Sequence, residues 1–399
     1  MSEARVEPAK LTRMSTPLAY DAAVSNGDTT VPENAPSEGA IRVLDLFAGA
    51  GGLTAGFHQA SKRFRSVRAV EWDLAAAASY EATFGEGIVY AGSIQDWLAT
   101  GESPEIDVIV GGPPCQGFST LGKREIEDER NHLWREYATT IVRTQPKYFI
   151  VENVAEFARS PQFQRFKRAT YGQGKLRDYS FRHAIFNSAD FGAPQARKRA
   201  VLIGYRRDLG FPGFPTPSHS ASPETDGKLP YRTVADALAG VPLVPDRDDE
   251  FDTYRTTFSG KTFAGSFHPR QLHWSRNYAD ISRRRFAAIP EGGNRFNLPE
   301  DLLAPCWVNH KTGSADVMGR LRWERPSVTI RTEFFKPEKG RYLHPTEDRA
   351  ITHYEAALLQ GFPADHRFVG SRTAIARQIG NAVPIALGAA VADVLARAL

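Results

Sequence analysis

Short apolar runs, separated by turns and helical stretches, dominate the chain from residue 41 to residue 151. We expect strands at 43–47, 66–70, 88–90, 108–110 and 148–151. The runs 108–110 and 148–151 are apolar throughout, which is typical of strands buried on both faces of a parallel sheet. The pattern therefore predicts an α/β fold with helices on both faces of the sheet.

The same pattern divides the chain into segments. Residues 1–40 are polar, are rich in Ser, Pro, Glu and Ala, and lack any period, so we expect a largely disordered tail. Residues 206–325 are loop-rich, with many Pro, Gly and aromatic residues. We expect them to form a smaller irregular domain, between a main domain at 41–205 and a closing segment at 326–399.

The closing segment predicts a final helix that returns to the main domain. Pro384 stands near its first turn, where proline is tolerated. Its buried stripe, read from the i, i+3, i+4 spacing, consists of Leu387, Ala390, Val391, Val394 and Leu395.

Composition narrows the class of protein. The 399 residues are enough for two domains, and the net charge of +4 with a pI near 9.0 permits a polyanionic partner without requiring one. Cys115 and Cys306 are the only cysteines, so we expect no disulfide framework, no cysteine-based metal site and an intracellular, cytoplasmic location. No apolar run approaches about 18 residues, so we expect no membrane span and no signal peptide.

The first strand, glycine turn and helix predict a nucleotide site, because amides at a helix N-terminus face the ligand. Thr54 stands where a dinucleotide motif would place its third glycine, which weakens a pyrophosphate interpretation. Glu71 and Trp72 follow the second strand, where a carboxylate can bind a ribose diol and an indole can stack on adenine. This combination favours S-adenosyl-L-methionine; the alternative for Glu71 is a solvated surface acid.

Cys115 is the candidate nucleophile. It follows the strand 108–110 through a Gly-Gly-Pro-Pro stretch at 111–114, which restricts the backbone and presents the thiol beyond the strand end. The alternative is a buried cysteine that acts as a small hydrophobe. Polar neighbours Gln116 and Ser119 argue against it.

Together, these segments resemble the ordered motifs of the DNA (cytosine-5)-methyltransferases. The motifs are Leu44–Gly52, Pro113–Gln116, Phe149–Val154 and Gln195–Arg199, and the resemblance extends from about residue 41 to the C-terminus. It implies a Rossmann-like S-adenosylmethionine-dependent methyltransferase sheet with a smaller irregular target-recognition domain. It also implies methyl transfer to C5 of a flipped-out cytosine in double-stranded DNA, with S-adenosyl-L-homocysteine as the product.

The chemistry of that reaction assigns roles to residues. Cytosine C5 is a poor nucleophile until a thiolate adds at C6, so Cys115 would form the covalent adduct. Glu152 would donate a proton or hydrogen bond at N3. By resemblance, Arg197 would engage the O2 side of the base and Arg199 would help order Glu152. The alternatives are that Glu152 caps the next helix, that Arg197 and Arg199 form a solvated face, or that the chain is an inactive relative.

The resemblance also implies a set of cofactor contacts: Phe47, Gly49, Gly51, Gly52, Leu53, Glu71, Trp72, Ser93, Ile94, Pro114, Asn381 and Val383. For Asn381 the alternative is a simple turn asparagine. Ser93 is a departure, because many relatives place an aspartate there to accept a hydrogen bond from the adenine amine. A serine hydroxyl accepts less strongly. We therefore expect modest cofactor affinity and a gain from Ser93→Asp.

A basic segment supplies candidate DNA contacts. With Gln116 and Ser119 of the nucleophile loop, these are Arg270, Arg276, Arg283, Arg284 and Arg285; the alternative is a solvated basic helix face. Residues 331–332 and 334–341 resemble the scaffold that fastens the recognition domain, and Cys306 is expected to be structural. We expect a monomer whose partner is double-stranded DNA, with a companion restriction endonuclease as a compatible partner, and neither a metal nor a membrane.

Two rival functions remain open at this level. A tRNA cytosine methyltransferase would share the catalytic motifs, although its relatives have a shorter recognition insert with an additional Cys-Phe-Thr stretch that this chain lacks. A non-catalytic DNA-binding regulator would keep the basic segment without needing Cys115, Glu152 and Arg197 together. The recognition sequence depends on loop geometry, which the sequence does not give.

Overall fold

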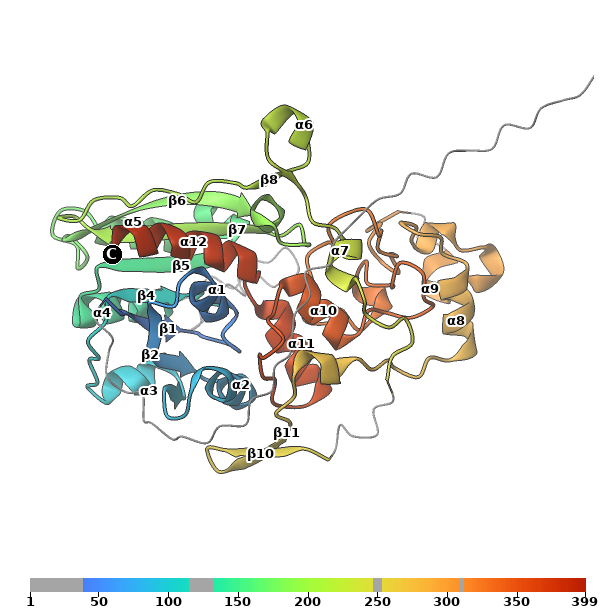
Figure 1. Ribbon diagram of the computed structural model, residues 1–399, viewed down its shortest axis with the longest axis horizontal. Coiled ribbons are helices and arrows are strands. Elements are labelled where there is room, and N and C mark those ends of the chain that lie inside the picture. Colours follow the sequence, from blue (N-terminus) through green and yellow to red (C-terminus); the bar gives the residue numbers. More distant parts are fainter. Residues whose placement is uncertain (1–38, 115–132, 247–252, 309–311) are drawn as a thin grey trace, which may run out of the picture. The chain divides into compact units, whose positions relative to one another are not determined.

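A computed structural model describes residues 39–114, 133–246, 253–308 and 312–399 (Figure 1). Residues 39–399 form one compact unit. The predicted tail lies outside the described residues except for positions 39 and 40, and so do Cys115, Gln116 and Ser119.

A seven-stranded sheet forms the main body, with strand order β3-β2-β1-β4-β5-β7-β6. Its strands are β1 (Ile41–Leu46), β2 (Phe64–Glu71), β3 (Val89–Ala91), β4 (Val108–Gly111), β5 (Tyr148–Val154), β6 (Tyr179–Asn187) and β7 (Lys198–Arg206). The first five are parallel, β7 is antiparallel to β5, and β6 is antiparallel to β7. The strand order reverses between β1 and β4, which is where open α/β sheets bind ligands.

Helices cover both faces of this sheet, as the apolar runs predicted (Figure 1). They are α1 (Gly52–Ala60), α2 (Leu74–Phe84), α3 (Ile94–Ala99), α4 (Leu133–Thr144), α5 (Pro161–Ala169) and α12 (Ile385–Ala398). Side chains of α1 and α12, among them Phe57 and Leu387, share one buried cluster with Val108 and Val110 of β4. Helices α3, α4 and α5 cover the other face through Trp97 and neighbouring aromatic side chains.

The first and last helices pack in close contact. A side chain at Gly56 of α1 would place its Cβ 2.8 Å from the carbonyl oxygen of Ile385 and from the amide nitrogen of Ala389 in α12. Of the predicted stripe, Leu387, Val391, Val394 and Leu395 are buried and Ala390 is half-buried. The C-terminal helix therefore packs on the first βα unit, through the buried stripe that its spacing predicted.

The remaining elements are short and lie mostly in the irregular region (Figure 1). The strands are β8 (His219–Ser220), β9 (Leu229–Pro230), β10 (Arg255–Phe258) and β11 (Lys261–Ala264), and the helices are α6 (Pro223–Asp226), α7 (Val234–Leu238), α8 (Asp280–Ala287), α9 (Pro305–Val308), α10 (His353–Gln360) and α11 (Arg372–Asn381). Single 3-10 turns are η2 (Ala155–Arg159), η3 (Ser188–Phe191), η4 (Pro269–Leu272), η5 (Arg295–Asn297), η6 (Glu300–Leu302) and η7 (Pro337–Lys339).

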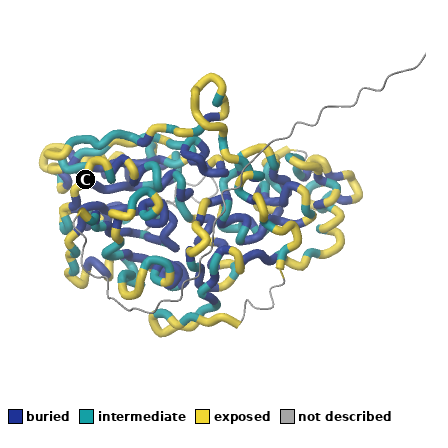
Figure 2. The backbone as a smooth tube through the Cα atoms, in the orientation of Figure 1, coloured by how far each residue is buried: buried dark blue, intermediate teal, exposed yellow. Residues whose placement is uncertain are grey.

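A second buried core holds these short elements together. Phe267, Ile330, Phe334, Phe368 and Ile379 belong to one cluster whose members come from residues 234–385 as well as from α1 and its preceding turn. Figure 2 shows buried segments running through the strands and through α10 and α11. The irregular region is thus packed on a shared core despite its lack of periodicity.

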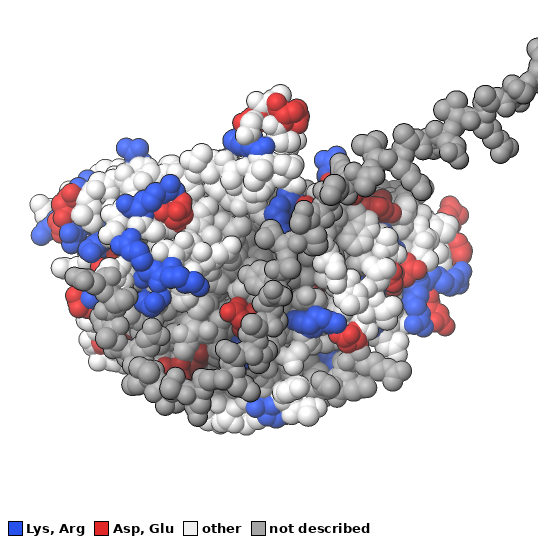
Figure 3. Space-filling model, viewed as in Figure 1, with Lys and Arg blue, Asp and Glu red and all other residues white. Residues whose placement is uncertain are grey.

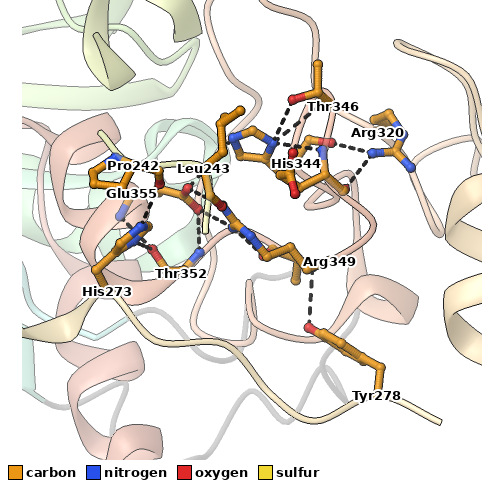
Figure 4. A network of polar contacts seen from close by, with 12 residues as sticks. Pro242, Leu243, His273, Tyr278, Arg320, His344, Thr346, Arg349, Thr352 and Glu355 are labelled. Atoms are coloured by element: carbon orange, nitrogen blue, oxygen red, sulfur yellow. Dashed lines mark hydrogen bonds and ion pairs between the residues drawn. The ribbon is translucent and has the colours of Figure 1, made fainter. Parts of the chain in front are cut away.

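A buried ion pair in the closing segment also contacts the irregular region at residues 206–325 (Figure 4). Both terminal nitrogens of Arg349 lie 2.8 Å from the two carboxylate oxygens of Glu355, and Arg349 also donates to the carbonyl of Leu243 at 2.9 Å. Burial is the largest influence on the pKa of Glu355 and raises it, but the hydrogen bonds and charge of Arg349, with smaller contributions from His344 and the Thr352 amide, together lower that pKa. His273 Nε2 donates to Pro242 O at 2.8 Å, so its Nδ1 can accept from Thr352 at 3.1 Å. Polar contacts therefore fix how residues 242–273 meet residues 349–355.

Within the described ranges, no single helix is long and apolar enough to cross a membrane, and α11 with α12 meets that criterion only as a pair bent by 45°.

Candidate active site

The glycine turn after β1 is held by a carboxylate from β2. Glu71 Oε2 accepts the amide of Gly49 at 2.8 Å, and Oε1 accepts the amide of Asp73 at 2.8 Å. Glu71 is only 6% exposed, and this burial raises its pKa to about 7 despite the two amides. The structure therefore places Glu71 against the turn that the sequence assigned to the cofactor.

Two glycines of the turn have distinct reasons to be glycine. Gly51 has φ 85° as the N-cap of α1, and a Cβ there would lie 2.1 Å from the Phe84 ring. A Cβ at Gly52 would lie 2.9 Å from the Ala382 side chain and 3.3 Å from the Val383 carbonyl. The structure thus brings residues 382–383 against the turn, while Asn381 lies exposed at the end of α11.

The base of the turn contains a polar contact that the sequence analysis did not anticipate. Thr54, noted only as a missing glycine, donates its hydroxyl to Asp45 Oδ2 at 2.5 Å. Burial raises the pKa of Asp45 to about 7, and the nearby Glu71 charge adds to the shift. The sequence did contain a signal for this contact: Thr54 lies two residues after the glycine turn, and Asp45 lies inside the preceding strand.

Strand β3 delivers further predicted residues beside Glu71. The amide of Gly92 donates to the carbonyl of Glu71 at 2.9 Å, so Ser93 lies at the edge of the sheet where β2 ends. Trp72 is 76% exposed, which leaves its ring face available, and Ile94 is buried. The turn, Glu71, Trp72 and Ser93 therefore gather at the carboxyl ends of neighbouring strands.

A second polar pair lies at the end of β5. Arg199 Nε lies 2.7 Å from Glu152 Oε1, and their side chains are 13% and 12% exposed. Glu152 pairs with Val201 and Arg199 pairs with Val154, so the two residues share one face of the antiparallel β5–β7 pair. A Cβ at Gly112 would lie 3.1 Å from Glu152 Oε2, so the loop that leads to Cys115 passes directly beside this carboxylate.

Asn153 is a positioning residue that the sequence analysis missed. It is buried, and its Nδ2 donates to the carbonyl of Pro113 at 2.8 Å. The contact ties the start of the nucleophile loop to the residue after Glu152. Pro114, which precedes Cys115, is the last described residue of this loop.

Arg197 does not share these contacts. Its Nη1 donates to Ile330 O at 2.7 Å and its Nη2 to Gly380 O at 3.0 Å. Burial lowers its pKa, and the charge of nearby Arg199 lowers it further. Arg197 precedes β7 and both of its terminal nitrogens bind main-chain carbonyls, so Arg199 rather than Arg197 is the arginine in contact with Glu152.

The five predicted DNA-contacting arginines do not form one open basic face. Three pair with carboxylates, Arg270 with Asp246, Arg283 with Asp280 and Arg284 with Asp301. Arg285 donates to Leu302 O, and Arg276 lies over the Tyr278 ring. In Figure 3 acidic and basic side chains are interspersed where α8 lies. Cys306, in α9, is an exposed free thiol.

A cavity of about 650 Å³ lies outside the predicted site residues: neither the candidate cofactor residues nor the Glu152–Arg199 pair line it. It is lined by the start of α2, by α11 and by the β10–β11 hairpin. At its wall, Arg377 lies 3.0 Å from Asp73, which directly follows Trp72. Only Asp73 connects this cavity in sequence to the candidate cofactor residues.

Comparison with known proteins gives consistent results. The family model described as C-5 cytosine-specific DNA methylase matches residues 41–397. The Type II methyltransferase M1.HphI of Haemophilus parahaemolyticus is 32% identical over 373 residues, covering 88% of this chain and 86% of the relative. Type II methyltransferase M.XorII of Xanthomonas oryzae is 32% identical over 387 residues, covering 89% and 84%.

The fold also matches solved structures. The crystal structure of a putative DNA modification methyltransferase encoded within an E. coli prophage has a TM-score of 0.63 at 24% identity, covering 89% of this chain and 98% of that one.

Proposed function

Because the chain belongs to the C-5 cytosine-specific DNA methylase family and is a DNA (cytosine-5)-methyltransferase, we propose that it methylates a cytosine swung out of double-stranded DNA through a covalent adduct of Cys115. Swinging the base out costs a few kcal/mol. The adduct is needed because C5 of cytosine attacks a methyl donor only after C6 has been saturated.

The proposed methyl donor is S-adenosyl-L-methionine, and the strand-end residues fit it. Glu71 presents a buried carboxylate beside the glycine turn, and the next residue, Trp72, presents an exposed ring. A side chain at Gly49 would meet no described neighbour within 4 Å, so the turn offers its backbone to a ligand there. When bound, the donor supplies an electrophilic methyl group.

The chain's own residues account for the remaining steps. The Cys115 thiolate forms a bond to C6, and electron density moves through the ring toward N3 and O2. Glu152 donates a proton or hydrogen bond at N3, which stabilises that charge. C5 then takes the methyl group, and solvent water accepts the C5 proton. N3 returns any proton that it received to Glu152, the C5–C6 double bond re-forms, and the C6–S bond breaks to regenerate the thiolate.

The contact that carries this proposal is the Glu152–Arg199 pair, with Gly112 directly beside it. It supports a site in which the loop to the nucleophile and the proposed acid meet at adjacent strand ends. We propose that Arg199 orients Glu152 at the base, and that Arg197 instead fastens residues 330 and 380 to the sheet.

DNA contacts are proposed for the arginines around α8. Their ion pairs are exposed, and exposed pairs contribute only about 0–1 kcal/mol, so phosphates can replace the acids. Since curated relatives are named Type II methyltransferases, we also propose that the chain protects DNA against a companion restriction endonuclease.

Methyl transfer from tritiated S-adenosylmethionine tests the proposal. We expect label in duplex DNA, recovered as 5-methylcytosine after digestion, and none in tRNA of equal cytosine content. Label confined to tRNA would replace the substrate class, and binding of DNA without transfer would replace the enzyme with a regulator. The Cys115→Ala variant provides a catalytic control, and Cys306→Ala controls for loss of a thiol elsewhere in the chain.

A further inference from the structure

The hydroxyl of Ser93 has two fixed partners within its own helix turn. Ser93 Oγ donates to Asp96 Oδ2 at 2.7 Å and accepts the amide of Asp96 at 3.1 Å. Ser93 is the N-cap of α3, and Asp96 lies in the first turn of that helix. The carboxylate is thus supplied three residues after the position where the resemblance expects an aspartate.

These contacts determine the hydrogen-bonding sense of the hydroxyl. A serine hydroxyl has one proton to donate and two lone pairs that accept. A carboxylate only accepts, so the proton is committed to Asp96; an amide N–H only donates, so one lone pair is committed as well. One lone pair remains, and Ser93 directly follows Gly92, whose amide donates to the carbonyl of Glu71 at the end of β2. Toward a ligand, Ser93 is therefore an acceptor only.

We propose that Asp96 is a specificity-determining residue, which locks Ser93 as an acceptor for the 6-amino group of an adenine ring. This inference rests on the proposed cofactor. An exocyclic amine donates to the free lone pair, whereas the 6-oxo group of a hypoxanthine ring would face it with lone pairs of its own. Sites built to bind one polar group reject the mismatched one because buried groups are left unpaired.

The arrangement alters the expected effect of Ser93→Asp. Asp96 Oδ2 lies 2.7 Å from Ser93 Oγ, so an aspartate at position 93 would bring two carboxylates together. We expect no tighter binding from Ser93→Asp alone, and tighter binding from Ser93→Asp combined with Asp96→Ala.

A second helix supplies a matched control. At the start of α7, Thr233 Oγ1 donates to Asp236 Oδ2 at 2.9 Å and accepts the amide of Asp236 at 3.2 Å. Figure 1 shows α7 well separated from α3. Asp236→Ala therefore removes the same local contact without touching the strand ends at β2 and β3.

The test compares S-adenosylhomocysteine with S-inosylhomocysteine, which differs at the 6-position. Dissociation constants are measured by calorimetry for the wild type, Asp96→Ala, Asp96→Asn, Ser93→Ala and Asp236→Ala, each checked for folding by circular dichroism. Preferences from elsewhere on the ring are common to all variants and cancel when the ratios of the two constants are compared.

We expect the wild type to prefer the adenine compound, and the preference to fall about three- to tenfold in Asp96→Ala, where the freed hydroxyl can donate to the oxo group. Asp96→Asn keeps an acceptor oxygen and should retain the wild-type ratio, as should Asp236→Ala. Ser93→Ala should reduce the preference to the part set elsewhere on the ring, and this variant serves if Asp96→Ala does not fold. An unchanged ratio in Asp96→Ala or Ser93→Ala overturns the inference alone, whereas no binding of S-adenosylhomocysteine by the wild type overturns the proposed cofactor too.

Discussion

Arg199 Nε lies 2.7 Å from Glu152 Oε1 across the β5–β7 pair. Arg197 lies two residues earlier in the chain, and its two terminal nitrogens donate hydrogen bonds to the carbonyls of Ile330 and Gly380. One arginine is therefore placed to act on the proposed acid, and the other to hold distant segments together.

Substitution of the two arginines should separate catalysis from stability. Arg199→Ala should lower the single-turnover methyl-transfer rate about 10²–10³-fold with little change in unfolding, because a preorganised group is lost at the reacting base. Arg197→Ala leaves two buried carbonyls unsatisfied and should lower the free energy of unfolding by about 2 kcal/mol or more. Rates and urea midpoints measured on both variants check this, and a reversed assignment of the two effects would contradict it.

Asn153 should matter for catalysis rather than for cofactor binding. Its amide holds Pro113, two residues before the nucleophile, at 2.8 Å. Small misplacements of reacting groups cost up to about 10²-fold in rate, so Asn153→Ala should slow transfer by roughly that factor. Asn153→Asp has the same shape but no donor, and it should be equally slow. A normal rate in both variants, with unchanged affinity for S-adenosylhomocysteine, would exclude the role.

Cofactor affinity should rise with pH through neutrality. Burial raises the pKa of Glu71 to about 7, so below pH 7 most free protein carries a proton there. Ribose hydroxyls that donate to the carboxylate favour its ionised form, and binding should therefore release a proton. Affinity for S-adenosylhomocysteine measured between pH 6 and pH 8 should increase, by less than about tenfold per unit.

Two variants check the source of that pH dependence. Glu71→Gln should bind S-adenosylhomocysteine weakly, with little variation between pH 6 and pH 8. Asp45→Asn should keep the rise of affinity with pH, because burial is the main cause of the raised pKa of Glu71.

The raised pKa of Glu71 also affects stability. Glu71 stabilises the fold below its unfolded pKa near 4.5, and this contribution is lost as pH rises through about 7. Glu71→Gln should thus gain stability relative to wild type from pH 5 to pH 8. A flat affinity profile in the wild type would contradict the account.

The buried Arg349–Glu355 pair should be expensive to break. Arg349 is 6% exposed and Glu355 is fully buried, so Glu355→Gln leaves a buried guanidinium without its counter-charge. Breaking such a pair should lower the free energy of unfolding by about 3–5 kcal/mol, and urea unfolding would measure the loss. Asp208→Asn, which removes the partner of Arg206 in an exposed pair, should leave the free energy of unfolding nearly unchanged. Equal losses in the two variants would be inconsistent with the network in Figure 4.

Local pattern predicted the parts of the site that lie at strand ends. Apolar runs located the ends of β2 and β5, and with them Glu71 and Glu152, because a strand buried on both faces leaves a contiguous signal. The Ser-x-x-Asp spacing from Ser93 to Asp96 was equally visible, since N-cap contacts arise between residues three apart. Strand β6 was missed because its side chains are mostly half-buried or exposed and form no apolar run.

Contacts distant in sequence could not be predicted in this way. Arg197 is bound to carbonyls 133 and 183 residues away, and it precedes β7, which begins at Lys198. Asn153 contacts Pro113 across 40 residues. The irregular region packs on a core shared with the turn before α1, which periodicity within that region cannot reveal.

Trapping of the covalent adduct tests the central claim most directly. The wild-type chain, S-adenosylmethionine and duplex DNA containing 5-fluorocytosine at every cytosine are incubated and separated under denaturing conditions. Fluorine at C5 prevents the final loss of a proton, so the account predicts a stable protein–DNA complex in the wild type and in Cys306→Ala, and none in Cys115→Ala. A complex that persists in Cys115→Ala, or its absence from the wild type, would contradict the account.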